Sequence, residues 1–292
     1  MLSKVRDIIQ ADGLSALASR SIAYAYRQGV RPFIPRREPV RYAGIPICHD
    51  VKWGDRIVPK LWVPVFARNE PNYEVTLVEG LRETISSGDR VVVVGGGLGV
   101  TATVAALRTG PSGTVQCFEG SKQHVRFVRQ TAARNNVNNV SVHHAVVAKS
   151  IAIYGRGSDL GAILPSSQLP ACEVLQLDCE GAEVEILRKL TIQPRVILVE
   201  THGLYGAPTD LVASLLRERG YIVSHRGAAV PGDDYCTKND IQVLLGSNRD
   251  FGTRSPPRTL ITSPKAHFFE RFHTDRTRLL DNVRRVEAGF LT

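Results

Sequence analysis

The chain has 292 residues, 43% of them hydrophobic, and a formal net charge of +9 at pH 7. This length can bury one large α/β core with appended segments. Because no apolar run approaches the roughly 20 residues of a membrane span and the N-terminus lacks the apolar core of a signal peptide, we expect a cytoplasmic protein.

The excess positive charge lies at the two ends of the chain. Residues 1–41 carry 8 Lys and Arg against 3 Asp and Glu, residues 248–292 carry 9 against 5, and residues 42–247 carry 20 of each sign. A neutral middle argues against an extended nucleic-acid groove, so no specific nucleic-acid partner is expected. Basic ends suit peripheral contact with an anionic membrane surface.

The cysteines and the paired histidines do not form a metal or disulfide pattern. The five cysteines are scattered and no C-x-x-C pair occurs, which disfavours a disulfide framework, a zinc ribbon and an iron–sulfur cluster. The adjacent His143 and His144 would point to opposite faces of a strand. These residues therefore predict no metal.

Residues 1–41 are predicted to form a basic helical extension, because apolar residues recur at helical spacing from Leu2 to about Gln28. We expect this helix to pack on the core or in a homodimer, and a membrane-surface helix is the alternative. The stretch "RPFIPRREPVRYAGIPI" (31–47) is rich in Pro and Arg and predicts an extended linker. Residues 42–71 are assigned as a linker on the substrate side.

Residues 72–247 are predicted to form the main domain, in which strands alternate with helices as in a doubly wound α/β sheet. Strands are expected at 89–94, 114–118, 140–142, 173–177 and 195–200. Helices are expected at 72–88, 100–108, 122–135, 182–190 and 209–219. Two more strands, in "GYIVSHRG" (220–227) and "NDIQVLLGS" (239–247), complete seven strands with an antiparallel pair.

Two segments depart from this alternation. Residues 143–171 are irregular, and "AVVAKSIAIYG" (145–155) predicts a β-hairpin rather than a crossover helix. Residues 248–292 are predicted to form a basic C-terminal extension that ends in a helix.

A glycine cluster follows the first strand directly, in "VVVVGGGLGV" (91–100). Glycines let the backbone approach a ligand, and the following helix start offers free N–H groups. The dinucleotide pattern G-x-G-x-x-G would place glycine where Val100 stands. The alternate spacing of Gly95, Gly97 and Gly99 instead looks like motif I of the S-adenosylmethionine (SAM) methyltransferases.

Acidic residues follow the ends of three other strands. Glu119 ends the second strand, where a carboxylate accepts hydrogen bonds from two ribose hydroxyls; NAD and SAM both have such a ribose. Asp178 and Glu180 follow the fourth strand, and Glu200 and His202 follow the fifth. Because the carboxyl ends of parallel strands meet at one edge, these side chains should line the acceptor side of a single crevice.

The chemistry of the second group leaves alternatives open. Asp178 can stabilise a cationic sulfonium or take a proton from an acceptor hydroxyl. His202 beside Glu200 suits a general base, and the alternative is that the pair fixes its loop by hydrogen bonds. Asp178 and Glu180 could hold Mg²⁺ or Ca²⁺, but a metal-free site is the first expectation. Glu183 falls in the first turn of the next helix, where it favours the helix dipole.

Two segments carry a family resemblance. "LQLDCEGAEVEIL" (175–187) and "VILVETHG" (196–203), together with "CFEG" and the glycine turn, resemble the FkbM family of SAM-dependent methyltransferases. The resemblance covers about 74–245, and its most specific part is the D-x-E-G-A-E segment. It implies the class I methyltransferase form of the Rossmann-like sheet, with SAM as the cofactor.

The resemblance also implies roles for the residues singled out above. The implied cofactor-binding residues are Gly95, Gly96, Gly97, Gly99, Glu119, Gly120 and Asp178. The implied catalytic residues are Asp178, Glu180, Glu200 and His202. The implied reaction is O-methylation of a hydroxyl or carboxylate on a sugar, a glycan or another small polyhydroxylated acceptor.

The sequence departs from the family pattern at Val93, where motif I usually has an acidic residue. Glu74 and Asn72, ahead of the first strand, are candidates to supply the missing group. Two alternatives follow: an NAD(P)-dependent oxidoreductase that uses the same turn and ribose acid, and a non-catalytic methyltransferase-like domain that docks through its basic ends.

Overall fold

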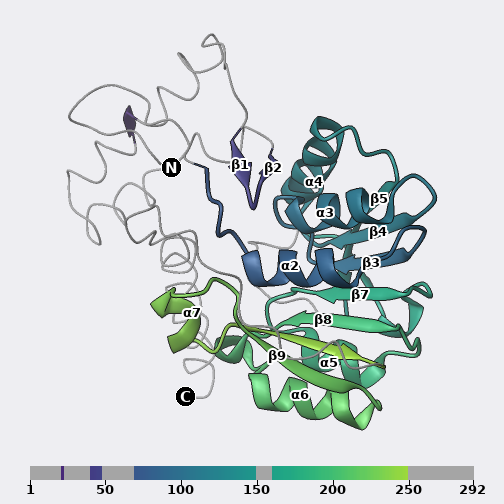
Figure 1. Cartoon of the computed structure of the whole chain (residues 1–292), viewed down its shortest axis with the longest axis vertical. Helices are drawn as coiled ribbons and strands as arrows, with labels where there is room; N and C mark the ends of the chain where they lie inside the picture. Colours follow the sequence, from purple (N-terminus) through teal and green to yellow (C-terminus); the bar gives the residue numbers. More distant parts are fainter. Residues whose placement is uncertain (1–20, 23–39, 48–68, 149–159, 249–292) are drawn as a thin grey trace, which may run out of the picture.

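The computed structural model of the chain describes residues 21–22, 40–47, 69–148 and 160–248 (Figure 1). The predicted C-terminal helix, and the predicted N-terminal helix apart from 21–22, lie outside the described residues. So does most of the segment 145–155 predicted as a hairpin.

One mixed sheet forms the centre of the described domain, with the strand order β6-β5-β4-β3-β7-β8-β10-β9. Its strands are β3 (Arg90–Val94), β4 (Thr114–Glu119), β5 (Val140–Val147), β6 (Ala162–Leu164), β7 (Val174–Leu177), β8 (Val196–Glu200), β9 (Ile222–Ala228) and β10 (Gln242–Ser247). All neighbours pair in parallel except that β10 runs antiparallel to β8 and β9. The predicted Rossmann-like, doubly wound sheet with a closing antiparallel pair is therefore confirmed.

The strand count differs from the prediction, because this sheet has eight strands rather than seven. The eighth is β6, which pairs in parallel with the Ala145–Val147 end of β5. β5 itself continues to Val147 instead of ending at Val142. The second half of the hairpin predicted over 145–155 lies outside the described residues, so that prediction stays untested; its described part pairs in parallel with β6.

Helices cover both faces of the sheet, which explains why its strands are apolar on both sides. Along β3, Val91 and Val93 join one core and Val92 and Val94 the other, because successive side chains point to opposite faces. The first face is covered by α2 (Val75–Thr84), α3 (Val100–Thr109) and α4 (Lys122–Arg134), and the second by α5 (Glu183–Lys189) and α6 (Thr209–Glu218) (Figure 1).

A short β-hairpin packs against the first of these cores. Strands β1 (Arg41–Tyr42) and β2 (Ile45–Pro46) pair in antiparallel fashion. Tyr42 and Ile47 are fully buried there, and Tyr42 also bridges to Glu70. Residues 40–47 therefore belong to the folded core, although the sequence predicts an extended linker over 31–47.

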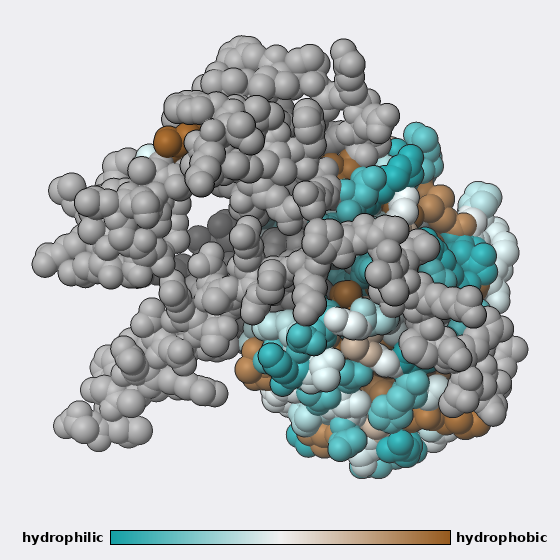
Figure 2. All heavy atoms as spheres, turned by 60° about the vertical axis from the view of Figure 1, so that its left-hand side comes forward, coloured by the Kyte–Doolittle hydropathy of each residue, from teal (hydrophilic) through white to brown (hydrophobic). Residues whose placement is uncertain are grey.

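The visible described surface is largely hydrophilic, with hydrophobic patches scattered over it (Figure 2). Among the described residues, the large hydrophobic side chains that remain exposed are Leu107, Ile163, Leu204 and Ile222. They lie on separate elements, as ordinary single exposures do. None of the helices within the described ranges is long and apolar enough to cross a membrane.

The winding of the sheet determines where a ligand can bind. β4 and β5 lie on one side of β3, and β7 and β8 lie on the other. In an open α/β sheet the ligand crevice forms at the carboxyl ends of the strands, at the point where the winding reverses. The tips of β3, β7 and β8 are therefore the place to look for a site.

Candidate active site

The glycine turn after β3 is locked against the tip of β7. Gly95 has φ +93°, and a Cβ atom there would lie only 1.7 Å from the carbonyl oxygen of Asp178. The backbone N–H of Asp178 in turn donates to the carbonyl of Val94 over 2.9 Å. Only glycine fits at position 95, so the turn and Asp178 hold a fixed relation.

The other glycines of the turn divide into packed and open positions. A Cβ on Gly96 would lie 2.7 Å from Cys117 Sγ, and one on Gly99 would lie 2.8 Å from the Cα of Val128 on α4. Gly97, with φ +48°, has no atom of the described residues within 4 Å of the corresponding position. Gly96 and Gly99 therefore serve packing, and Gly97 is the glycine that faces open space.

Glu119, at the end of β4, is buried and holds this turn in place. Its Oε2 accepts the backbone N–H groups of Gly96 and Gly97, each over 2.9 Å, and its Oε1 accepts that of Ser121 over 2.7 Å. A carboxylate offers about four acceptor positions, so one remains after these three bonds. The predicted ribose role stays a prediction, whereas the link to the glycine turn is an added function of this side chain.

Gly120, also predicted to bind the cofactor, is a packing position. A Cβ on it would lie 2.9 Å from Val146 Cγ2 on β5. Its carbonyl lies 3.1 Å from the Nε2 of His144, which also sits on β5. Glycine at this point lets the end of β4 approach its neighbour closely.

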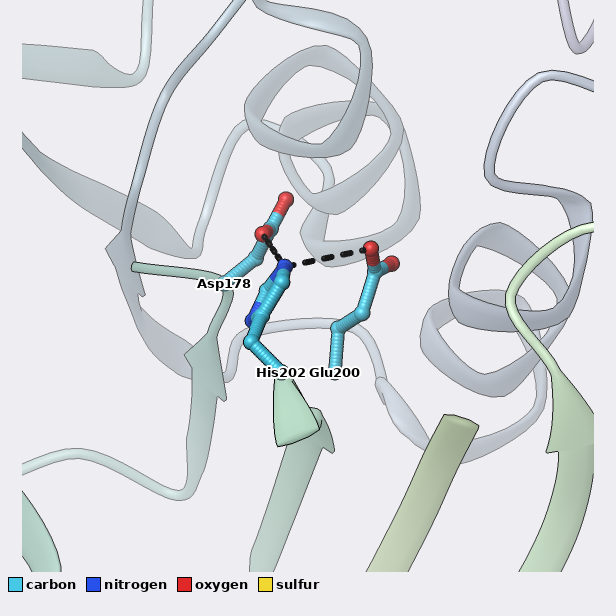
Figure 3. Close-up of side chains that lie close together, drawn as sticks. All are labelled: Asp178, Glu200 and His202. Carbon is cyan, nitrogen blue, oxygen red and sulfur yellow. Dashed lines mark ion pairs between the residues drawn. The ribbon is translucent and has the colours of Figure 1, made fainter. Parts of the chain in front are cut away.

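The tips of β7 and β8 bring three of the predicted catalytic residues together (Figure 3). The Nε2 of His202 lies 3.6 Å from Asp178 Oδ1 and 3.7 Å from Glu200 Oε1. Glu200 and His202 are nearly inaccessible, with 2% and 4% of their surface exposed, while Asp178 is partly exposed. The backbone of His202 is held by reciprocal hydrogen bonds with Ala207.

Glu183 orients His202 from the first turn of α5. Its Oε1 lies 2.9 Å from His202 Nδ1, and its Oε2 accepts the backbone N–H of Gly181 over 2.7 Å. The side chain is completely buried. Sequence reasoning assigned Glu183 only to the helix dipole and missed this contact, because nothing in the local pattern shows that the loop after β8 returns to α5.

Glu180 lies in the sharp turn from β7 to α5. It has φ +54°, a left-handed conformation that is unusual for a residue with a side chain, and Gly181 follows with φ +102°. The negative charge of Glu180 contributes to raising the pKa of Asp178. The charge of this predicted residue therefore acts on the carboxylate of Asp178.

Glu74 joins the group from the start of α2. Burial, and then the charge of Asp178, raise its pKa to about 8, while a hydrogen bond from Tyr73 and the charge of His202 oppose the shift. Val93, the position where an acid was expected, is fully buried in the core. Glu74 thus adds a carboxylate at the strand tips rather than within β3.

The crowding of these carboxylates determines the charge state of the site. Burial raises the pKa of Asp178 to about 7, and neighbouring carboxylates add to the shift while His202 opposes it. Burial disfavours a charged His202, but Glu183, Asp178 and Glu200 outweigh it and raise its pKa to about 10. A histidine held protonated in this way is not a general base at neutral pH, which favours the alternative that it fixes the loop.

The arrangement can therefore do two things chemically. It presents several carboxylates around one imidazole at the open end of the sheet, which attracts a cation. It also places acceptors for a proton beside the turn that holds Gly97. The carboxylates and the glycine turn both lie at the carboxyl ends of the parallel strands, where an open α/β sheet binds its ligand.

The family comparison agrees with the sequence resemblance. Residues 118–223 match the model of the methyltransferase FkbM domain. The match includes Glu119, Asp178, Glu200 and His202, and the glycine turn lies just before it. No curated protein matches the chain.

Several solved structures are similar to the chain. Precorrin-6y C5,15-methyltransferase from Geobacter metallireducens is 15% identical, with 62% of this chain and 89% of that chain covered and a TM-score of 0.41. Aeropyrum pernix fibrillarin in complex with natively bound S-adenosyl-L-methionine is 13% identical, with 56% and 68% covered and a TM-score of 0.38. A putative O-methyltransferase from Klebsiella pneumoniae is 13% identical, with 63% and 83% covered and a TM-score of 0.39.

The strand order of the sheet, its glycine turn after β3 and the matched segment are consistent with one another. Over residues 118–223 the chain is therefore similar to methyltransferase FkbM domains.

Proposed function

We propose that the protein is a SAM-dependent O-methyltransferase that acts on a hydroxyl or carboxylate of a sugar, a glycan or another small polyhydroxylated acceptor. One observation carries the proposal. The glycine turn and the carboxylates of β7 and β8 are rigidly joined through the contact between Gly95 and Asp178, so a cofactor cradle and a proton-accepting cluster adjoin each other.

The residues of the turn fit the proposed cofactor. Gly97 leaves open space beside the backbone, and Gly99 caps α3 without bringing a side-chain acceptor to its N-terminus. Such a helix start favours the carboxylate of a methionine moiety. The remaining acceptor position of Glu119 suits a ribose hydroxyl.

The cofactor supplies an electrophilic methyl group whose S–C bond breaks with the electron pair left on sulfur. The residues of this chain position the acceptor oxygen for in-line attack and accept its proton as the C–O bond forms. Asp178, Glu180 and Glu200 are the proposed proton acceptors and orienting groups. His202 lies between the carboxylates of Asp178 and Glu200 and attracts both. Polyhydroxylated acceptors suit a site rich in carboxylates, because each hydroxyl can donate a hydrogen bond.

Titration calorimetry of the full chain with SAM, S-adenosylhomocysteine and NAD tests the cofactor. We expect both sulfur compounds to bind and NAD to give no heat. Binding of NAD alone would favour the oxidoreductase alternative and reject the proposal.

Transfer of a labelled methyl group to a panel of mono- and oligosaccharides tests the acceptor. We expect the label on oxygen, identified by the chemical shift of a methoxy carbon in the isolated product. Label found on carbon or nitrogen would support methyl transfer by this protein but reject an oxygen atom as the acceptor.

A further inference from the structure

Three side chains at the tips of β7 and β8 bring one donor atom each close together. One donor atom each from Asp178, Glu200 and His202 lies within 4.8 Å of the other two. The two contacts of His202 Nε2 with the carboxylates, 3.6 Å and 3.7 Å, are longer than hydrogen bonds. Donor atoms about 2.0–2.2 Å from a shared cation would be separated by roughly 3–3.6 Å, close to these distances.

Glu200 provides an independent sign of a missing partner. Its Oε2 is completely buried and has no hydrogen-bond partner among the described residues, and the residue as a whole is only 2% exposed. The other oxygen of the same carboxylate, Oε1, faces the Nε2 of His202 (Figure 3). A buried carboxylate oxygen without a partner is costly, because burial removes it from water without replacement.

The partner of His202 on its other side fits the same interpretation. Glu183 Oε1 holds the Nδ1 of the ring at 2.9 Å, so the Nε2 is directed toward the two carboxylates. Metal-binding histidines commonly bond a carboxylate through their second nitrogen in this way, which fixes the ring and its tautomer.

The donor set indicates the class of cation. Two carboxylates and one imidazole nitrogen form a mixed set, which suits Mn²⁺ and similar first-row cations better than Mg²⁺ or Ca²⁺ with their oxygen ligands. Glu74 and Glu180 lie close enough to act electrostatically on Asp178 and Glu200, and they add to the attraction for a divalent charge.

We propose that Asp178, Glu200 and His202 bind one divalent first-row cation of the Mn²⁺ type, and that the cation displaces the proton that His202 Nε2 carries in its absence. From the sequence, a metal-free site is the first expectation, and Asp178 and Glu180 are the candidate ligands if a cation binds. The inclusion of Glu200 and His202 is therefore new. The role of the cation rests on the function proposed above: it binds the acceptor oxygen beside the glycine turn. Binding itself does not depend on that function.

Electron paramagnetic resonance of the full chain titrated with Mn²⁺, without SAM or acceptor, tests the site. We expect about one Mn²⁺ per chain and an electron spin echo modulated by a nitrogen nucleus, because His202 Nε2 is a ligand. His202→Gln should abolish the nitrogen modulation. Glu200→Gln should weaken Mn²⁺ binding by at least about tenfold, given that even indirect ligand partners contribute 10–100-fold.

Glu218→Gln is the matched control, because Glu218 is an exposed carboxylate on α6 away from the strand tips. It should bind Mn²⁺ as the wild type does. Circular dichroism of each metal-free variant checks the fold. If His202→Gln fails to fold, the nitrogen modulation of the wild type and the Mn²⁺ affinity of Glu200→Gln still test the cation site.

Absence of stoichiometric Mn²⁺, or bound Mn²⁺ without nitrogen modulation, would overturn the inference. Titration of SAM into chelator-treated protein separates this result from the proposed function. A protein that binds SAM but fails to bind Mn²⁺ would reject the cation site alone. A protein that binds Mn²⁺ but fails to bind SAM would reject the methyltransferase proposal alone.

Discussion

Glu119 joins the end of β4 to the glycine turn through three backbone N–H groups. A residue expected to bind the cofactor is thus also responsible for the shape of the cradle. Gly95 has the same double character, because its contact with Asp178 connects the cradle to the carboxylate cluster. At the scale of single residues, structural and functional roles coincide at the strand tips.

Replacement of Glu119 tests how much this side chain contributes to the stability of the protein. Glu119→Gln loses at least one buried acceptor, and we expect the free energy of unfolding to fall by about 1–3 kcal/mol. Glu173→Gln is the control, because Glu173 also accepts a backbone N–H, from Arg90, but lies at the exposed amino end of β7. That change should cost about 1 kcal/mol or less in urea denaturation. Equal losses would show that the turn does not depend on Glu119.

Gly97 permits a sharper test of the cradle, because a second glycine shares its geometry. Gly97 and Gly220 both have positive φ, +48° and +85°, and both face open space. Alanine at either position should cost about 1–2 kcal/mol of stability through left-handed strain. Only Gly97→Ala should also weaken SAM binding, by about tenfold or more, as measured by calorimetry. Similar affinities for the two variants would remove Gly97 from the site.

At the scale of elements, most of the parallel strands and the helices between them agree with the prediction to within a few residues, and the exceptions are the longer β5 and the missed β6. Long apolar runs and periodic helices carry a strong local signal. The structure adds β6 and α7 (Asp234–Lys238), both missed because segments of three and five residues carry too little pattern. The positions that follow the strands predicted Asp178, Glu180, Glu200 and His202, and Glu74 was a candidate for the missing acid. The contact of Glu183 with His202 arises from tertiary packing that one sequence does not reveal.

The first turn of α5 offers a matched pair for testing such a link. Glu183 and Glu185 both lie in this turn, but Glu183 is buried against His202 and Glu185 pairs with Lys189 near the surface. Glu183→Gln should lower the Mn²⁺ affinity of the proposed cation site by about 10–100-fold, because His202 loses its charged partner. Glu185→Gln should leave it unchanged. An unaltered affinity in Glu183→Gln would mean that His202 needs no such support.

At the scale of the whole molecule, a domain of balanced charge lies between two basic ends. Residues 42–247 carry equal numbers of each sign, whereas residues 1–41 have an excess of five positive charges. Juxtaposed basic residues contribute about 1 kcal/mol each near an anionic surface, within a Debye length of about 10 Å at 0.1 M salt. The acidic strand tips and the basic ends are thus suited to different partners: a cationic ligand and an anionic surface.

Removal of residues 1–39 tests the second of these partnerships and keeps Tyr42 and Ile47, which the core requires. We expect the full chain to be retained by vesicles that contain anionic lipid at low salt, and to be released as salt rises, because exposed charges are screened. The shortened chain should be retained less at low salt and bind SAM as the full chain does. Retention that persists at high salt would point instead to apolar insertion, and equal retention of both chains would show that residues 1–39 do not contact the membrane.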